Sequence, residues 1–464
     1  MLATATAAQA SLQGTLSGPV EVARRSAQAV GVAVTDVTTG EPVYGFNAER
    51  ALIPASNTKL VTTAAAIVAL GPGYQFVTPL LTNGDVVDGV LQGDLAVVGS
   101  GDPNLSARFH SGRPLGVFDA WIARLRELGI ERVTGRLLLA DGLFGREHVH
   151  PSWPQEQLDQ WYEAPVGALS FNDNCVLVRV RPGRPGDPVE VELAPDVGAL
   201  AVENRASTGS SRSRMSLALG RRPGSDLIEI WGSLPADWPP VERWITVPSP
   251  AAYFGAAFAH ALAAAGITLD GARELIEELP RGDWRRVGEL RSDLLTTIEV
   301  TNWRSQNFYA EALLKLLGAR LCGEGSWEAG VDAVRHVLDS LGLDGEPQQA
   351  DGSGMSRDNR LAAADFTALL AAMAGHRYGG EFLRSLPWGG QPGTTLEKRF
   401  RIEPYRGNVF AKTGYLSGVT ALSGYAKARS GRLYAFSILL NGANGYTRGR
   451  DLADAIVRTL IDAG

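Results

Sequence analysis

Residues 54–60 read Pro-Ala-Ser-Asn-Thr-Lys-Leu, and a mostly apolar run follows them to residue 70. The apolar side chains of residues 60–70 recur with helical spacing, which predicts a buried helix that begins near Ser56. Ser56 and Lys59 are three residues apart, so they would share one face of this helix and their polar ends could meet. The stretch therefore predicts a helix that carries a hydroxyl and an amine in its first turn.

A serine next to a lysine is a possible nucleophile with its base. A serine hydroxyl needs a base to become reactive, and a lysine is a base only when its pKa falls. The positive end of a helix, apolar neighbours and a second cation all lower that pKa. Taken alone, the string is more typical of a solvated lysine beside an N-cap serine than of catalysis, but the apolar run after Lys59 favours a buried site.

A second string, Ser305-Gln306-Asn307, precedes the mostly apolar residues 308–314 and predicts the entry to another helix. Simple helix capping explains such residues equally well. In the functional interpretation Ser305 relays a proton, and Asn307 orients Lys59 or binds a peptide group of a substrate.

A third string, Lys412-Thr413-Gly414, is predicted to lie on a strand. A lysine and a threonine hydroxyl that face a cleft can hold a carboxylate, and a glycine lets a ligand approach the backbone closely. For this string alone, an exposed lysine on an edge strand is the favoured interpretation. Lys412 could also be the second cation that lowers the pKa of Lys59.

The periodicity predicts one antiparallel sheet that is built from both ends of the chain and flanked by helices, an α/β (α+β) class. A long stretch at about residues 74–279 has a different sequence pattern, typical of short strands joined by Gly and Pro turns. Within it, the polar segment 207–216 is predicted to be a solvated loop, and a helix is predicted at about 256–266. The simplest organisation is a catalytic domain interrupted by a large insertion. The strands of the terminal sheet are predicted at residues 31–37, 43–46, 409–412, 419–428 and 433–440, and the closing helix at 450–460.

The composition excludes several classes of protein. The chain has 464 residues and a net charge of −6, which argues against nucleic acid as the main partner because phosphate binding needs a basic face. No apolar run is long enough for a transmembrane segment. The Ala/Thr-rich residues 1–12 lack a basic segment followed by an apolar core, so we do not expect a complete secretory signal there. Two interpretations stay open, a cytoplasmic protein or an exported chain whose signal has been removed.

The remaining reactive side chains give weaker patterns. Cys175 and Cys322 are predicted to be isolated, buried thiols without a disulfide. His148 and His150 could share a strand face, but no cysteine or H-E-x-x-H pattern completes a zinc site, so no metal is expected. The chain has no G-x-S-x-G elbow on which a Ser-His-Asp triad could be built.

In this order, the three strings spell S-x-x-K, S-x-N and K-T-G. Together with residues 99–103, 168–174 and 351–357, they make the chain similar over nearly its whole length to the D-alanyl-D-alanine carboxypeptidase/endopeptidase family, the low-molecular-mass class C penicillin-binding proteins of peptidase family S13. The resemblance implies a serine β-lactamase/DD-peptidase-like sheet with a large, mostly β insertion and a smaller domain nested inside it. It implies a penicillin-binding, transpeptidase-like catalytic domain at residues 1–73 and 280–464, an inserted domain at 74–175 and 247–279, and a nested domain at 176–246.

The resemblance also implies catalytic roles. Ser56 would attack the carbonyl of the penultimate D-alanine and form an acyl-enzyme, while Lys59 would take its proton. Ser305 and Lys412 would help to return a proton to the leaving amine, and Asn307 would hold the substrate amide. No cofactor is implied.

Further positions are implied to bind substrate. Thr413 would hold the terminal carboxylate, and the oxyanion hole would use the backbone N–H groups of Ser56 and Tyr415, which follows Gly414. Tyr415 is bulkier than the small residue that is often found there in the family.

A recognition site for the diaminopimelate end of a cross-link is also implied. Asp141, on the inserted domain, and Ser353 and Arg357, in the loop 351–357, match the family's pattern, although Met355 replaces its usual leucine. A carboxylate and a guanidinium suit the head group of a free amino acid.

The expected partners are therefore peptidoglycan stem peptides and cross-links, with β-lactam antibiotics as covalent inhibitors. Such a substrate implies an exported protein in the periplasm or cell envelope. Two alternatives stay open: a β-lactamase or esterase on the same core, and an inert peptidoglycan-binding protein.

Overall fold

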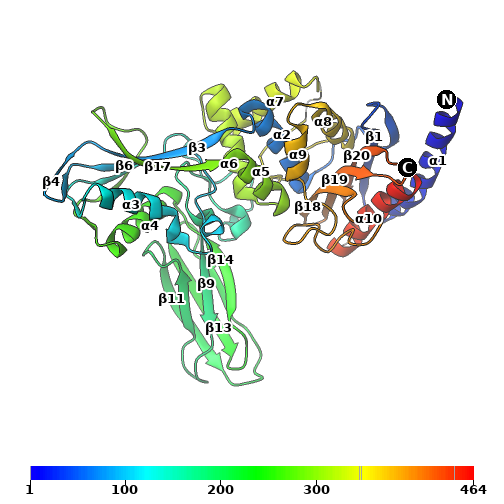
Figure 1. The fold of residues 1–464 in the computed structure, drawn as a ribbon. Helices are drawn as coiled ribbons and strands as arrows, with labels where there is room; N and C mark the ends of the chain where they lie inside the picture. The colour runs from blue at the N-terminus through cyan, green and yellow to red at the C-terminus, as the bar shows by residue number, and fades with distance from the viewer. Residues whose placement is uncertain (1, 344, 346, 444) are drawn as a thin grey trace. The chain divides into compact units, whose positions relative to one another are not determined.

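The computed structural model describes residues 2–343, 345, 347–443 and 445–464. The chain divides into two compact units, unit 1 (Met1–Tyr74 and Asp293–Gly464) and unit 2 (Gln75–Ser292), and Figure 1 shows their elements. Both ends of the chain therefore belong to unit 1, and one continuous insertion forms unit 2. The finer division that the sequence predicts, with a nested domain at 176–246, stays a prediction.

Unit 1 is built on one antiparallel five-stranded sheet in the order β18-β19-β20-β1-β2. Strand β1, from the N-terminal part of the chain, pairs with β20, from the C-terminal part, along its whole length. The predicted sheet from both chain ends is thus confirmed. Its strands are β1 (Ala29–Asp36), β2 (Pro42–Phe46), β18 (Val409–Leu416), β19 (Val419–Lys427) and β20 (Leu433–Asn441).

The two faces of this sheet pack against different helices. Val409 and Ala411 point into a core that includes α1 (Leu2–Ser26) and α10 (Tyr446–Ala463). On β19 the Tyr425 hydroxyl donates to the Leu370 carbonyl of α8 (Ala363–Gly375) at 2.7 Å. Successive residues of a strand alternate between faces, so Lys412 lies on the α8 side, the same side as Tyr425.

The helix predicted near Ser56 begins as a short 3₁₀ turn, η1 (Ala55–Asn57), and continues as α2 (Thr58–Leu70). Residues 58–67 of α2 are all buried, which explains why the run after Lys59 is apolar. The helix predicted after Ser305 is α6 (Asn307–Leu317), whose eleven residues are all buried. The other helices of unit 1 are α5 (Leu294–Trp303), the π-helical turn η7 (Gly318–Cys322), α7 (Trp327–Ser340) and α9 (Gly379–Ser385).

Unit 2 contains four small sheets around one buried apolar cluster. The rings of Phe118, Trp121, Phe254 and Phe258 pack together in this cluster, with centroids 5.1–6.2 Å apart. Its helices are α3 (Asp119–Glu127) and α4 (Pro250–Ala264). Its strands are β3 (Gln75–Thr82), β4 (Asp85–Val87), β5 (Val90–Gln92), β6 (Leu95–Val98), β7 (Arg132–Val133), β8 (Leu137–Ala140), β9 (Cys175–Arg181), β10 (Glu190–Ala194), β11 (Ala201–Gly209), β12 (Ala218–Arg221), β13 (Leu227–Pro235), β14 (Val241–Thr246), β15 (Thr268–Leu269), β16 (Arg273–Ile276) and β17 (Arg285–Asp293).

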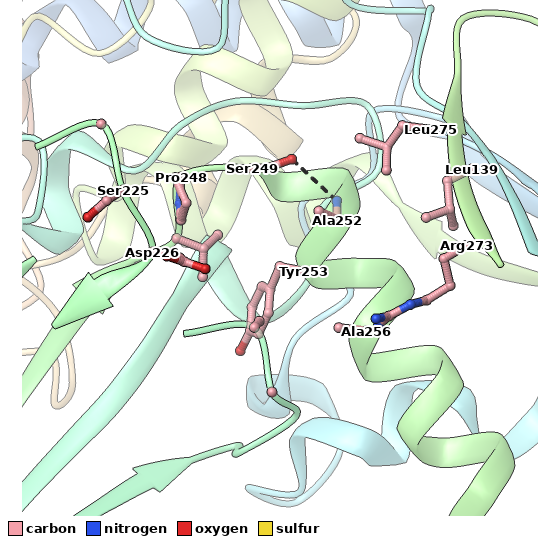
Figure 2. Close-up of a pocket in the computed structure, with 14 residues that line it drawn as sticks. Leu139, Ser225, Asp226, Pro248, Ser249, Ala252, Tyr253, Ala256, Arg273 and Leu275 are labelled. Atoms are coloured by element: carbon pink, nitrogen blue, oxygen red, sulfur yellow. Dashed lines mark hydrogen bonds between the residues drawn. The ribbon is translucent and has the colours of Figure 1, made fainter. Parts of the chain in front are cut away.

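A cavity of about 630 Å³ lies along one side of α4 in unit 2. Figure 2 shows Asp226, Tyr253 and Arg273 among the side chains around it. The helix starts beside this cavity, where the Ser249 hydroxyl accepts from the Ala252 N–H at 3.4 Å as an N-cap.

Two local predictions were wrong in part. Residues 207–209 of the predicted solvated loop belong to β11, because they pair in parallel with residues 233–235 of β13; residues 210–217 lie outside strands. Cys175 is buried and unpaired as predicted, but Cys322 is exposed, because it ends the π-helical turn after α6. Within the described residues no helix is both long and apolar enough to cross a membrane.

Candidate active site

Ser56 lies in the 3₁₀ turn that leads into α2. The residue before it, Ala55, has a φ of 49°, a conformation that non-glycine residues adopt at a cost and that is common at functional sites. The half-buried Ser56 lies next to the N-terminal end of α2, where the helix dipole favours negative charge. The turn therefore presents the hydroxyl where a developing alkoxide is stabilised.

Lys59 is fully buried, and its amine is surrounded by oxygen acceptors. Its Nζ donates to Ser56 Oγ at 3.0 Å, to Asn307 Oδ1 at 2.7 Å and to the Ser353 carbonyl at 2.7 Å. Burial lowers the pKa of Lys59 to about 7, although the nearby Glu311 carboxylate acts in the opposite direction. An amine with such a pKa can accept a proton at neutral pH.

A second lysine–serine pair joins the S-x-N and K-T-G strings. Lys412 Nζ donates to Ser305 Oγ at 2.7 Å and to the Thr413 carbonyl at 2.8 Å. Lys412 is fully buried, so burial lowers its pKa well below the ordinary value, and the charge of Lys59 lowers it further. Ser305 has a φ of 57°, and this left-handed residue separates α5 from α6. The three strings thus meet in unit 1.

Gly414 and Asn57 bring β18 against the turn that carries Ser56. A Cβ atom at Gly414 would lie only 2.8 Å from the Pro54 carbonyl oxygen, so the close approach of β18 requires a glycine. Asn57 Nδ2 donates to Ser423 Oγ of β19 at 2.6 Å. The sequence does not predict a role for Asn57, because its partner lies 366 positions away in the chain.

The loop that begins at Asp351 is organised by a buried carboxylate. Asp351 accepts from the N–H groups of Gly354 and Ser356 at 2.7 and 2.5 Å and from Asn359 Nδ2 at 2.9 Å. Ser353, predicted to bind substrate, is fully buried, and it contacts Lys59 through its backbone carbonyl.

The other predicted substrate-binding residues of unit 1 lie around β18. Thr413 is half-buried, and Tyr415 is 49% exposed. The exposed Arg357 donates through Nη2 to the Ser417 carbonyl at 2.7 Å, in the turn between β18 and β19. Their roles toward a substrate stay predictions.

Asp141 belongs to unit 2. Its Oδ1 accepts from the Leu169 N–H at 2.5 Å, and His148 Nε2 lies 3.6 Å from its Oδ2. This carboxylate is mostly buried, with 12% of its side chain exposed. Among the described residues no group of three or more His, Cys, Asp or Glu side chains could hold a metal ion.

Comparison with known proteins decides the family. The model of the D-Ala-D-Ala carboxypeptidase 3 (S13) family matches residues 14–462. The chain belongs to this family. Its members are serine peptidases, and the resemblance inferred from the sequence strings is thereby confirmed.

Individual relatives agree with this assignment. The chain is 37% identical over 431 residues to a D-alanyl-D-alanine carboxypeptidase of Actinomadura sp. (strain R39). The alignment covers 89% of this chain and 78% of that protein. It is 26% identical over 418 residues to D-alanyl-D-alanine carboxypeptidase DacB of Haemophilus influenzae, which covers 89% of this chain and 85% of the relative.

A solved structure shows the same fold. The crystal structure of penicillin binding protein 4 (dacB) from Haemophilus influenzae superimposes with a TM-score of 0.83 at 24% identity, covering 96% of this chain and 98% of that one. The same protein has also been solved in complex with a β-lactam. The predicted fold class, a DD-peptidase-like sheet flanked by helices with a large insertion, is confirmed.

Proposed function

We propose that this S13 family member is a serine DD-peptidase that acts through an acyl-enzyme on Ser56, with D-Ala-D-Ala carboxypeptidase and peptidoglycan DD-endopeptidase activity. The observation that carries the proposal is a fully buried amine, Lys59 Nζ, 3.0 Å from the Ser56 hydroxyl. An amine in this position is the base that a serine nucleophile needs.

The first half-reaction forms an ester. Ser56 Oγ attacks the carbonyl carbon of the penultimate D-alanine, and its proton passes to Lys59, whose pKa is lowered to about 7 by burial. The peptide C–N bond then breaks, and the leaving amine of the terminal D-alanine takes a proton from Ser305. Lys412, which donates to Ser305 at 2.7 Å, replaces that proton.

The second half-reaction releases the product. A water molecule attacks the ester, its proton passes to the lysine–serine network, and the Ser56 hydroxyl is restored. In a β-lactam the corresponding amide lies in a ring, so the leaving amine stays attached and blocks the water. This chemistry supports β-lactams as covalent inhibitors.

The same cluster supports a proposal for how the end of the substrate binds. Thr413 binds the terminal carboxylate beside the buried Lys412. The N–H groups of Ser56 and Tyr415 form the oxyanion hole, where they stabilise the negative oxygen of the transition state. Asn307 holds the substrate amide and keeps Lys59 in place through its 2.7 Å contact.

The cross-link is the larger substrate. We assign Asp141 to the ammonium group of a diaminopimelate end, with Ser353 and Arg357 as the family's other positions in this recognition. Peptidoglycan lies outside the cytoplasm, so the proposal includes an exported, periplasmic or cell-envelope location.

Release of D-alanine from a small acyl-D-Ala-D-Ala peptide tests the proposal. We expect release by the wild-type protein and none by Ser56→Ala. A protein that binds muropeptides but releases no D-alanine would be an inert wall-binding protein. Rapid turnover of penicillin would instead identify a β-lactamase.

A further inference from the structure

Glu311 is a buried carboxylate that none of the three motifs includes. It is fully buried on α6, one helical turn after Asn307. Its two oxygens accept from the Gly352 N–H at 2.9 Å, the Ser353 N–H at 2.7 Å and Trp327 Nε1 at 2.8 Å. Three donors fix the orientation of this carboxylate. Burial and the nearby Asp351 carboxylate raise the pKa of Glu311 to about 7, although these hydrogen bonds act in the opposite direction.

The backbone that Glu311 holds is the backbone that contacts Lys59. The Ser353 carbonyl accepts from Lys59 Nζ at 2.7 Å, and the Gly352 carbonyl accepts from Thr62 Oγ1, on α2, at 2.8 Å. A Cβ at Gly352 would lie 2.6 Å from the Ala310 carbonyl oxygen, so the loop is pressed directly onto α6. Helix α6 therefore reaches Lys59 twice, directly through Asn307 and indirectly through Glu311.

The charged groups around Lys59 also favour a role for Glu311. The buried titratable groups around Lys59 are the amine of Lys412 on β18 and the carboxylates of Glu311 on α6 and Asp351 in the loop; Lys315 of α6 lies further out, with Nζ 4.1 Å from the centre of the Trp327 ring. Burial disfavours a charged Lys59, whereas the Glu311 carboxylate, followed by that of Asp351, raises the pKa of Lys59.

We propose that Glu311 is a positioning residue for Lys59: it holds the Gly352–Ser353 backbone so that the Ser353 carbonyl keeps the amine beside Ser56, and it places a carboxylate near that amine. The inference rests on the proposed function, because it gives a buried carboxylate a part in preparing the general base.

Glu311→Gln separates this role from a purely structural one. The glutamine side chain is similar in size to glutamate but carries no charge. Its NH₂ group is itself a hydrogen-bond donor, so it cannot accept from the N–H groups that bind Glu311. Without the negative charge Lys59 loses its proton more easily, so the acidic limb of the acylation rate should move down by about 1 pH unit. The maximal rate should fall at least ~10-fold, because the Ser353 carbonyl is no longer held.

The measurement is the rate of Ser56 acylation by a fluorescent penicillin between pH 5 and 9. Trp327→Phe is the matched control: it removes one neutral donor but keeps a carboxylate at position 311, so its acidic limb should stay closer to the wild-type pH than that of Glu311→Gln. A folded Glu311→Gln protein whose acidic limb coincides with that of the wild type would overturn the proposal.

A second variant keeps the test decisive if Glu311→Gln does not fold. Glu311→Asp keeps a carboxylate, but its side chain is shorter by one methylene and reaches the Gly352 and Ser353 N–H groups less well. We therefore expect slower acylation, with an acidic limb at the same pH as in the wild type. Acylation at the wild-type rate would refute the positioning role. A wild-type protein that is never acylated at Ser56 would instead refute the proposed function.

Discussion

At the scale of single residues, the site contains two buried amines. Lys59 and Lys412 are both fully buried, and the charge of Lys59 lowers the pKa of Lys412. Ammonium groups are costly in a low-dielectric interior, so burial lowers the pKa of both amines. The sequence identifies both lysines, but it cannot give their pKa values, because these depend on burial and on distant carboxylates.

The pH dependence of acylation tests this arrangement. The pKa of Lys59 is lowered to about 7, so below that pH the amine is protonated and cannot accept the Ser56 proton. We expect the acylation rate to rise as the pH passes through about 7 and to level off above it. Stopped-flow labelling with a fluorescent penicillin measures this, and a rate that is flat between pH 5 and 9 would rule out Lys59 as the base.

Asp141 gives a second prediction at this scale. Asp141→Ala should reduce cleavage of peptides with a diaminopimelate end more than cleavage of simple acyl-D-Ala-D-Ala mimics, because only the former present an ammonium group to the carboxylate. The ratio of kcat/KM for the two substrates measures the effect. Equal losses on both would reject a recognition role.

At the scale of elements, the site depends on β18 lying against the 3₁₀ turn at Ser56. Local periodicity predicts α2, α6 and β18, because each carries its pattern within about ten residues. It cannot predict that Gly414 touches the Pro54 carbonyl, or that Glu311 holds the N–H groups of residues 352 and 353. These contacts join parts of the chain that only the tertiary fold brings together.

Gly414→Ala tests the contact between β18 and the turn. The added Cβ would lie 2.8 Å from the Pro54 oxygen, so we expect a loss of about 1–3 kcal/mol in unfolding free energy and much slower acylation of Ser56. Gly73→Ala is the control, because a Cβ there meets nothing within 4 Å. Urea unfolding and penicillin labelling measure both effects, and a Gly414→Ala protein that behaves like Gly73→Ala would contradict the role of the contact.

At the scale of the whole molecule, the two ends of the chain together form unit 1, and the insertion between them forms unit 2. The change in sequence pattern near residue 74 predicts that an insertion interrupts the catalytic domain, and both chain ends do share one sheet. The exposure of Cys322 and the strand at residues 201–209 were not predicted, because a π-helical turn and a parallel strand pairing leave little trace in local composition.

Glu163 makes unit 2 sensitive to pH. It is fully buried, within the described residues no hydrogen-bond partner is found for either carboxylate oxygen, and burial raises its pKa to about 8. Between the ordinary pKa of 4.5 and about 8, the unfolded chain is ionised at Glu163 while the folded chain keeps the proton. The stability contributed by this group is therefore complete below pH 4.5 and is lost as the pH rises toward 8.

Glu163→Gln should remove this dependence. The wild-type protein should lose more unfolding free energy than the variant between pH 5 and 8, by roughly 1.4 kcal/mol for each unit of pKa difference. Urea unfolding at both pH values measures the change. Parallel losses in the two proteins would show that Glu163 does not titrate in this way.

The most direct test of the central claim is the site of penicillin attachment. After exposure to penicillin, intact-protein mass spectrometry should show one added acyl group, and peptide mapping should place it on Ser56. The Ser56→Ala protein should gain no mass. A label on any other residue, or an unchanged label in Ser56→Ala, would contradict the assignment of Ser56 as the nucleophile.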